Sequence, residues 1–299
     1  MPASPAPSPA PLAPGLYVVA TPIGNDADLS PRARDVLARA DAVLAEDTRR
    51  AGLFFQRLGI LRARKGFLSL HEHNETGRIP QVLELLAQGQ AVALISDAGT
   101  PVLADPGFRL VRTCREAGLR VVPVPGPSAP AVALSACGLP PAPYTFLGFL
   151  PRQKGQAKKL LARHRATGAT LVFFERKDRL AATLSLAAEV LGDREFALCR
   201  ELTKVYEEFI LGRLGRLQDV SLDLLGEITV VVGPEPLAGP TATAESGGGA
   251  DADLALELAA IMAEEKARGG KPREVARRVV LRMPAFSVKD IYERLGRKG

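Results

Sequence analysis

The feature that most constrains the fold is a regular alternation of short apolar segments with helix-like segments over the first half of the chain. Alternation of this kind is typical of parallel strands joined by crossover helices. Helices are expected to begin near Ser30, to run through Leu53 and Leu86, to span Phe108 to Glu116, and to open near Pro127. The strands between them are LYVVA (16–20), AVLA (42–45), FLSL (67–70), AVALI (91–95) and LRVVPV (119–124). The pattern predicts an open α/β sheet.

The second half has a different texture and predicts a second domain. A helix-like segment at 156–164 and another at 179–190 flank the strand TLVFFE (170–175), after YTFLGFLP (144–151). Three further strand-like segments then follow closely, which indicates a mixed or antiparallel sheet. They are FALCREL (196–202), EEFILGRL (207–214) and EITVVVG (227–233).

Composition sets the remaining boundaries. Residues 1–14 are rich in Pro, Ala and Ser and predict a disordered leader, and 234–252 reads as a flexible linker. The expected domains are therefore 15–143, 144–233 and a helical module at 253–299. That module carries 11 Lys and Arg against 7 Asp and Glu, so it holds +4 of the chain's net +6. Such an excess is compatible with a polyanionic partner.

Other compositional features exclude several classes of protein. No window approaches the roughly 18 uninterrupted apolar residues of a membrane helix, so a soluble protein is expected. Cys114, Cys137 and Cys199 are far apart and form no CxxC pair, so buried thiols in a reducing cytoplasm are expected instead of a zinc site. HEHNE (71–75) lacks the HExxH spacing of zinc proteases, and no metal is expected.

Four loops at predicted strand ends stand out, because ligands of open α/β sheets bind at the carboxyl ends of the strands. They are ATPIGN (20–25), LAEDTRR (44–50), ISDAGTPVLADPG (95–107) and VPVPGPSAP (122–130). None has the GxGxxG or GxxxxGK[ST] pattern, which disfavours a dinucleotide-binding unit and a P-loop. Glycine and proline in these turns let the backbone approach a flat, polar small molecule such as an adenosine.

The ordered set of motifs resembles the tetrapyrrole-methylase superfamily, from about Gly15 to Gly233. Within it the chain resembles the bacterial methyltransferases that modify a cytidine 2′-hydroxyl in small-subunit 16S ribosomal RNA. The motifs are TPIGN, AEDTR, HEHNE, SDAGTPVLADPG, PGPS, GFLPR, FFE, RELTK and GEITVVV. The resemblance implies S-adenosyl-L-methionine as cofactor, bound in a cleft between two α/β domains. It also implies a homodimer, and RNA as the partner in place of DNA or a membrane.

The resemblance implies cofactor contacts from both domains. Family members have the residues Gly-Asp-Pro where this chain has Gly-Thr-Pro at 99–101. A carboxylate role therefore does not transfer to Thr100. Asp97 either contacts the cofactor or caps its own loop. The full expected set is Pro22, Ile23, Asp97, Gly99, Thr100, Pro101, Leu103, Ser128, Ala129, Phe174, Glu175, Leu202, Ile228 and Thr229.

The acceptor hydroxyl is a poor nucleophile, so a base would help the reaction. Candidate bases are Glu46, Asp47, Glu201 and Lys204, of which Asp47 is equally a helix cap. Lys204 could serve only if burial or a cationic neighbour lowered its pKa. Asn74 is expected either to contact RNA or to cap a helix. The expected substrate contacts are Arg49, His71, Asn74, Arg200, Arg277 and Arg278.

Two other functions compete with this interpretation. One is methylation of a tetrapyrrole precursor of cobalamin, against which the basic tail and the AEDTR and HEHNE motifs argue. The other is a non-catalytic RNA-binding assembly factor with the same fold. Cofactor binding, followed by methyl transfer to small ribosomal subunits, separates the three.

Overall fold

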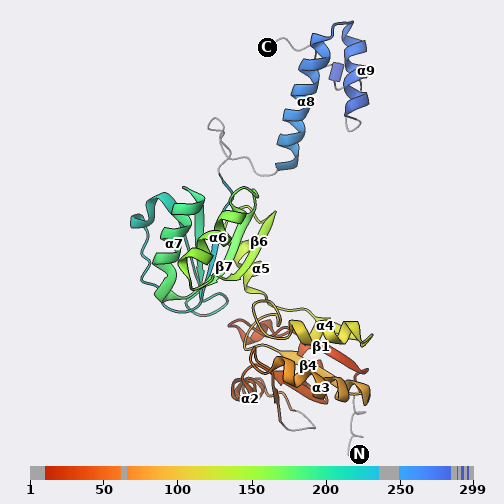
Figure 1. The fold of residues 1–299 in the computed structure, drawn as a ribbon, viewed down its shortest axis with the longest axis vertical. Coiled ribbons are helices and arrows are strands. Elements are labelled where there is room, and N and C mark those ends of the chain that lie inside the picture. The colour runs from red at the N-terminus through yellow and green to blue at the C-terminus, as the bar shows by residue number, and fades with distance from the viewer. Residues whose placement is uncertain are drawn as a thin grey trace, which may run out of the picture. The chain divides into compact units, whose positions relative to one another are not determined.

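The computed structural model describes residues 11–61, 66–235 and 249–283, together with residues 288, 291, 292 and 295. The chain divides into two compact units, Met1–Leu237 and Ala238–Gly299. The first unit contains two sheets and the second a pair of helices (Figure 1). None of the helices in these described ranges has the length and apolar character that a bilayer crossing requires.

The first sheet is parallel throughout and has the order β3-β2-β4-β1-β5. Its central strand β4 is AVALI, which is buried at every position, as expected for a strand covered on both faces. The predicted strands are confirmed as β1 (Gly15–Val19), β2 (Ala42–Ala45), β3 (Leu68–Ser69), β4 (Ala91–Ile95) and β5 (Val121–Val124).

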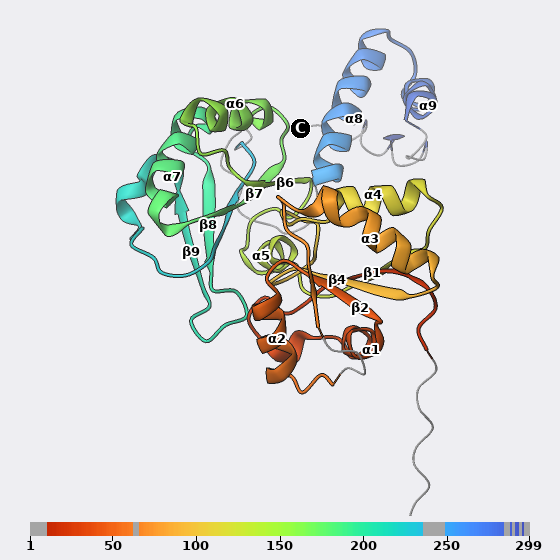
Figure 2. The ribbon, with the colours of Figure 1, turned by 60° about the horizontal axis from the view of Figure 1, so that its bottom comes forward.

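Helices cover both faces of this sheet (Figure 2). Helices α1 (Pro31–Arg39) and α2 (Thr48–Arg57) pack on one face, and α3 (Glu75–Ala87) and α4 (Phe108–Glu116) pack on the other. A short 3₁₀ helix η1 (Asp26–Asp28) precedes α1, and α5 (Ala129–Ala136) follows β5. The Ser30 hydroxyl accepts from the Ala33 amide at 3.1 Å and Pro31 opens α1, so the predicted cap is confirmed.

The second sheet is mixed and has the order β6-β7-β10-β8-β9. Only the β6–β7 pair is parallel, and the other pairs are antiparallel. Its elements are β6 (Tyr144–Phe149), α6 (Lys154–His164), β7 (Thr170–Glu175), α7 (Lys177–Leu191), β8 (Glu195–Arg200), β9 (Glu208–Arg213), η2 (Leu214–Asp219) and β10 (Ile228–Val232).

We call the elements β1 to α5 the first lobe and β6 to β10 the second lobe. Helices α6 and α7 cover one face of the second sheet, and α5 of the first lobe covers the other.

The second unit consists of α8 (Gly249–Ala267) and α9 (Pro272–Arg282). They share a small apolar core that includes Leu258, Val275 and Val279. Helix α8 begins at Gly249, within the segment expected to be linker, while residues 236–248 lie outside the described residues. Beyond residue 283 of the expected helical module, the structure describes residues 288, 291, 292 and 295, and each is helical.

The end of the expected leader is attached to the first lobe. Leu12 packs against the core formed by α1 and α2, and the Tyr17 hydroxyl donates to the Ala13 carbonyl at 2.7 Å. Residues 1–10 lie outside the described residues. An apolar side chain and one hydrogen bond therefore place residues 12 and 13 against the fold, where the composition predicted disorder.

Candidate active site

The loop after β4 is tied to the loops after β1 and β5. The Thr21 amide donates to the Gly99 carbonyl at 2.8 Å, and the Gly99 amide donates back to Thr21 at 3.1 Å. The Thr100 hydroxyl donates to the Pro127 carbonyl at 2.9 Å. Three strand-end loops thus form one platform, and Thr100 has the structural role of joining two of them.

Glycine is favoured at position 99 because the backbone there has a φ of +77°. A Cβ atom at this position would lie 3.2 Å from Ile23 Cγ2. The neighbouring Val102 and Ala104 also have positive φ, at 77° and 69°. For a β-branched residue such as Val102 this conformation is strained, and strain of this kind clusters at ligand-binding sites.

A loop of the second lobe contacts this platform. The Asn25 amide donates to the Thr203 hydroxyl at 3.1 Å, and any side chain at Gly24 would collide with Lys204 Cγ. Glu201 and Thr203 in this loop also have positive φ, at 50° and 64°. Close backbone approach across the two lobes therefore explains why TPIGN carries a glycine.

A cavity of about 500 Å³ lies between these loops and is lined by both lobes. Its volume is in the range of small-molecule sites. Most of the residues predicted to contact the cofactor line it: Ile23, Gly99, Thr100, Leu103, Ser128, Ala129, Phe174, Glu175, Leu202, Ile228 and Thr229. Pro22, Asp97 and Pro101, also predicted, are not among its lining residues.

Asp97 makes an interaction that neither prediction for it included. Its carboxylate accepts from Arg50 Nη1 at 2.7 Å, so it anchors the start of α2 to the loop after β4. The loop-capping interaction belongs to Ser96, whose hydroxyl donates to the Ala98 carbonyl at 3.1 Å. Because Arg50 is distant in sequence, the local pattern could not reveal the ion pair.

Asp105 is the most important cavity residue that the sequence analysis missed. Burial raises the pKa of its carboxyl from 3.8 to about 6; a hydrogen bond with Ser96 opposes this rise, and the nearby Glu46 and Asp97 carboxylates add to it. The Asp-Pro-Gly turn at 105–107, in the loop after β4, was the sequence feature that could have indicated Asp105. Other lining residues not predicted are Ala98, Ala104, Pro130, Phe149, Arg176, Lys177, Asp178, Cys199, Gly226 and Glu227.

The two acids of AEDTR have separate roles. Asp47 is the N-cap of α2, accepting from the amides of Arg49 at 2.8 Å and Arg50 at 3.2 Å, and these bonds lower its pKa. Burial raises the pKa of Glu46, and the Asp97 carboxylate adds to the rise. Glu46 is therefore the better proton acceptor of the two, while Arg49 lies exposed on the first turn of α2.

Lys204 does not meet the condition for a base. Burial opposes its charge, but bonds to Glu201 at 3.0 Å and Glu227 at 3.1 Å outweigh burial and raise the pKa of the ammonium. Burial also works to raise the pKa of Glu201, but the Glu227 amide and Lys204 hold it below its ordinary value. Arg200 pairs with Glu208 at 2.6 Å and does not lower the pKa of Lys204. Lys204 and Glu201 are therefore ion-pair partners in this structure.

The HEHNE motif forms the turn between β3 and α3. Asn74 occupies the N-cap position of α3, but its side chain accepts from the His71 amide at 2.8 Å and donates to the Ser69 hydroxyl at 2.9 Å. Its predicted capping bond is absent, because the amide holds the preceding loop instead. His71 Nδ1 is buried and has no hydrogen-bond partner among the described residues.

The two arginines predicted for the tail differ in their surroundings. Arg278 donates to the Glu265 carboxylate at 2.8 Å and to the Gly269 carbonyl at 2.7 Å, so it fastens α9 to α8. Arg282 also bonds Glu265, whose side chain is only 1% exposed. Arg277 is exposed on the outer side of α9. Arg278 is therefore a structural residue of the helix pair, and Arg277 is available to a partner.

The two lobes and the cavity between them define a class of protein. The tetrapyrrole (corrin/porphyrin) methylase family matches residues 15–218, and the chain belongs to this family. The solved structure of the methyltransferase CobJ has the same fold, with a TM-score of 0.56 at 19% identity over 78% of this chain and 97% of that one.

Sequence relatives narrow the class. The chain is 46% identical to the ribosomal RNA small subunit methyltransferase I of Mesorhizobium japonicum, over 90% of this chain and 92% of the relative. It is 47% identical to the protein of that name from Escherichia coli O157:H7, over 68% and 70% of the two chains. The Thermotoga maritima relative is 42% identical, over 73% of this chain and 97% of its own. The chain is therefore a methyltransferase.

Proposed function

We propose that the chain transfers the methyl group of S-adenosyl-L-methionine to the 2′-hydroxyl of a cytidine in 16S ribosomal RNA of the small subunit. The observation that carries the proposal is the cavity between the lobes, in a chain that matches ribosomal RNA methyltransferases over most of its length. A small-molecule cavity is what a cofactor-dependent enzyme needs, and a non-catalytic assembly factor does not need it.

The residues of the cavity fit the cofactor. Apolar side chains, among them Ile23, Leu103, Phe149 and Phe174, supply walls for a flat adenine ring. Asp105 supplies a carboxylate for the positive charges of the cofactor, and partial burial strengthens such an interaction. When bound, the cofactor supplies a methyl group activated by a sulfonium.

The acceptor hydroxyl needs positioning and removal of its proton. The Glu46 carboxylate is close enough to Asp105 to help raise the pKa of Asp105. The pKa of Glu46 is itself raised, which suits Glu46 to accept the proton of the acceptor hydroxyl. Asp47 caps α2, and Lys204 forms an ion pair with Glu201, so both residues hold their loops in place. Arg49, His71, Arg200 and Arg277 are the side chains proposed to contact RNA, with Asn74 holding the His71 loop.

The test combines cofactor binding with transfer. Calorimetry should show one S-adenosylmethionine site per chain, and small subunits from a strain lacking the enzyme should gain a methyl group on a cytidine ribose, located by mass mapping. Gly77→Ala in the exposed part of α3 is a control for glycine substitutions at the site, because no atom beyond the neighbouring backbone of α3 lies within 4 Å of the added carbon. Binding without transfer to subunits, or transfer to a corrin precursor, would reject the proposal.

We also propose that the protein acts in the cytoplasm, where small subunits are found, and that it forms a homodimer, as its family resemblance implies. Light scattering of the purified full chain should give twice the 31.7 kDa of one chain. A monomer that is fully active would refute the dimer while leaving the enzymatic proposal intact.

A further inference from the structure

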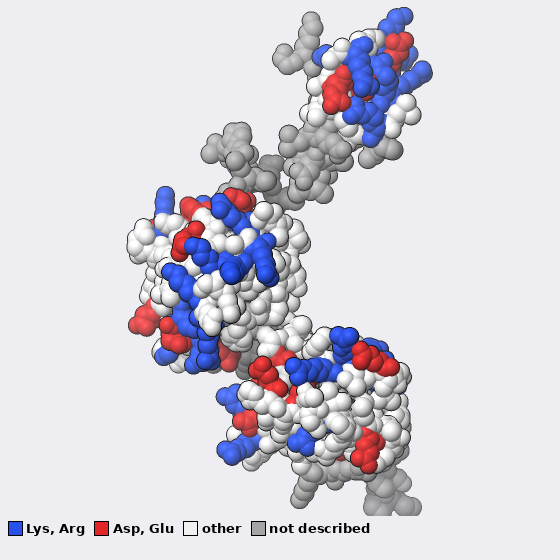
Figure 3. Space-filling view, in the orientation of Figure 1, with Lys and Arg blue, Asp and Glu red and all other residues white. Residues whose placement is uncertain are grey.

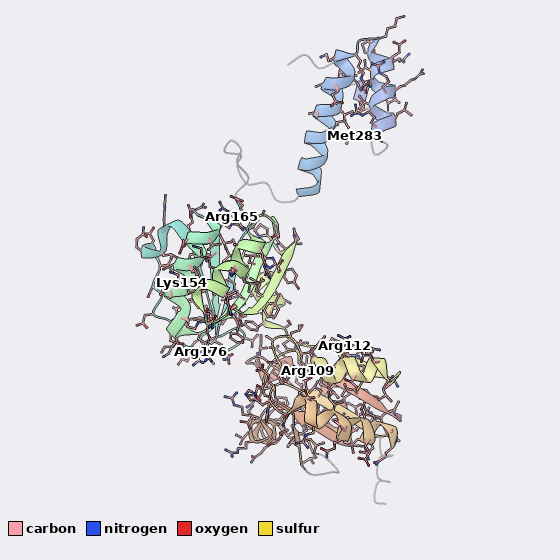
Figure 4. All side chains as sticks on the ribbon, viewed as in Figure 1. Arg109, Arg112, Lys154, Arg165, Arg176 and Met283 are labelled. Atoms are coloured by element: carbon pink, nitrogen blue, oxygen red, sulfur yellow. The ribbon has the colours of Figure 1, made fainter. Side chains whose placement is uncertain are left out.

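The exposed face of α6 and the start of α7 carry a concentration of basic side chains. Lys and Arg form a band over this part of the second lobe (Figure 3), and Lys154 and Arg176 are among them (Figure 4). Their side chains are 76% and 68% exposed. Arg152 and Lys177 are exposed as well. A hollow of about 670 Å³ lies within this α6–α7 basic surface and is lined by Arg152, Lys154, Arg176 and Arg179.

The local carboxylates do not neutralise this surface. Glu189 accepts from Lys158 at 2.5 Å and lies 4.0 Å from Lys154, while Asp178 lies 3.5 Å from Arg176. These pairs are solvent-exposed, and exposed ion pairs contribute little to stability. The phosphates of a polyanion can therefore displace the carboxylates from these cations. Arg179 is already used internally, donating to the carbonyls of Leu150 and Pro151.

The surface starts at the mouth of the methyl-transfer cavity. Arg176 and Asp178 line both the cavity and the hollow, and Lys177 lines the cavity. A polyanion whose reacting ribose lies at the cavity would therefore pass its neighbouring phosphates over this surface. Exposed guanidinium and ammonium groups bind phosphate without reading base sequence.

We infer that the α6–α7 basic surface binds the phosphodiester backbone of the RNA strand next to the methylated nucleotide. The inference rests on the proposed function, because it takes RNA as the substrate. It adds a phosphate-binding surface in the second lobe to the one proposed for the C-terminal helices, where Arg278 and Arg282 are bonded to Glu265 and Arg277 is exposed.

The test uses the full chain carrying Arg152→Gln and Lys154→Gln, which lie outside the lining of the cofactor cavity. Binding of a labelled single-stranded RNA oligonucleotide is followed by fluorescence anisotropy between about 50 and 200 mM salt. Loss of two phosphate contacts should reduce the log–log salt slope by about 1.4, at about 0.7 per contact, and so weaken binding about 25-fold near 0.1 M salt.

The matched control is Lys159→Gln with Arg163→Gln, which removes two positive charges, as the test variant does, and takes both from α6. At 100° per residue these two positions lie on the side of α6 away from Lys154. The control should keep nearly the wild-type affinity and slope. Equal losses in both variants would mean that net charge alone matters, and that result would overturn the inference.

Two further readouts separate the inference from the proposed function. Calorimetry should give the same S-adenosylmethionine affinity for both variants and the wild type. If the wild type methylates small subunits but the Arg152/Lys154 variant binds RNA with an unchanged slope, the surface serves another partner, such as an acidic protein, and only the inference fails. If the wild type binds the cofactor but neither RNA nor subunits, both fail.

Discussion

Replacing Asp105 with Asn should weaken cofactor binding and, in the absence of cofactor, stabilise the protein. The carboxyl lines the cavity, where its pKa is raised from 3.8 to about 6, mainly by burial. Loss of a charge-assisted hydrogen bond costs about 1.5–3 kcal/mol. At pH 8 the variant should therefore bind S-adenosylmethionine about tenfold to 150-fold more weakly by calorimetry.

The effect on stability has the opposite sign. Because the folded-state pKa of Asp105 lies above its ordinary value of 3.8, this carboxyl favours folding at low pH, and its contribution is lost as the pH rises from about 4 to about 6. The full difference between a pKa of 3.8 and one of about 6 corresponds to about 3 kcal/mol in the free energy of unfolding. Because the group is partly exposed, solvent screening reduces this contribution to about 1 kcal/mol. The cofactor-free variant should then melt about 2–4 °C above wild type at pH 8 and at the same temperature near pH 4.

The pH dependence of binding provides the sharpest test. Wild-type affinity should be constant above about pH 7 and fall as the pH drops through about 6, while the variant shows no such fall. Comparing the two proteins cancels the titration of the ligand itself. Asp178→Asn is the control, because it removes the same charge from a cavity-lining side chain that is 64% exposed, and it should change affinity little. Parallel pH profiles for wild type and Asp105→Asn would refute the reasoning.

Other predictions concern the platform, the base and the tail. Gly99→Val should abolish cofactor binding with the fold retained by circular dichroism, since φ there is +77°; unchanged affinity would remove this loop from the site. Glu46→Gln should lower kcat at least tenfold with little change in cofactor affinity, and full activity of this variant would exclude Glu46 as the base. Asp47→Ala should lower the melting temperature by a few degrees, because α2 loses its N-cap. Removing residues 240–299 should leave cofactor affinity unchanged and raise the apparent KM for subunits severalfold, and loss of cofactor binding would show the tail to be structural.

Much of the fold could be predicted because its signals are local. The run AVALI and its counterparts give the strands, and Ser30 with Pro31 gives a helix start, since caps and periodicity depend on near neighbours. The motif order also identified half of the residues that line the cavity, although the roles proposed for those residues rest on resemblance. Strand-end loops gather at one edge of any parallel sheet, which is why their residues could be grouped before the sheet was known.

The tertiary structure decided what depends on distant neighbours. Strand β10 lies between β7 and β8, an order that chain sequence does not predict. Lys204 is held as a cation by Glu227, Asp97 is bound by Arg50, and Arg278 is bonded to Glu265, each through a partner that no local pattern identifies. The pKa of Asp105 likewise follows from burial and from Glu46, a residue of another loop. Charge states and ion pairs depend on burial and on through-space distances, and only the folded chain fixes both.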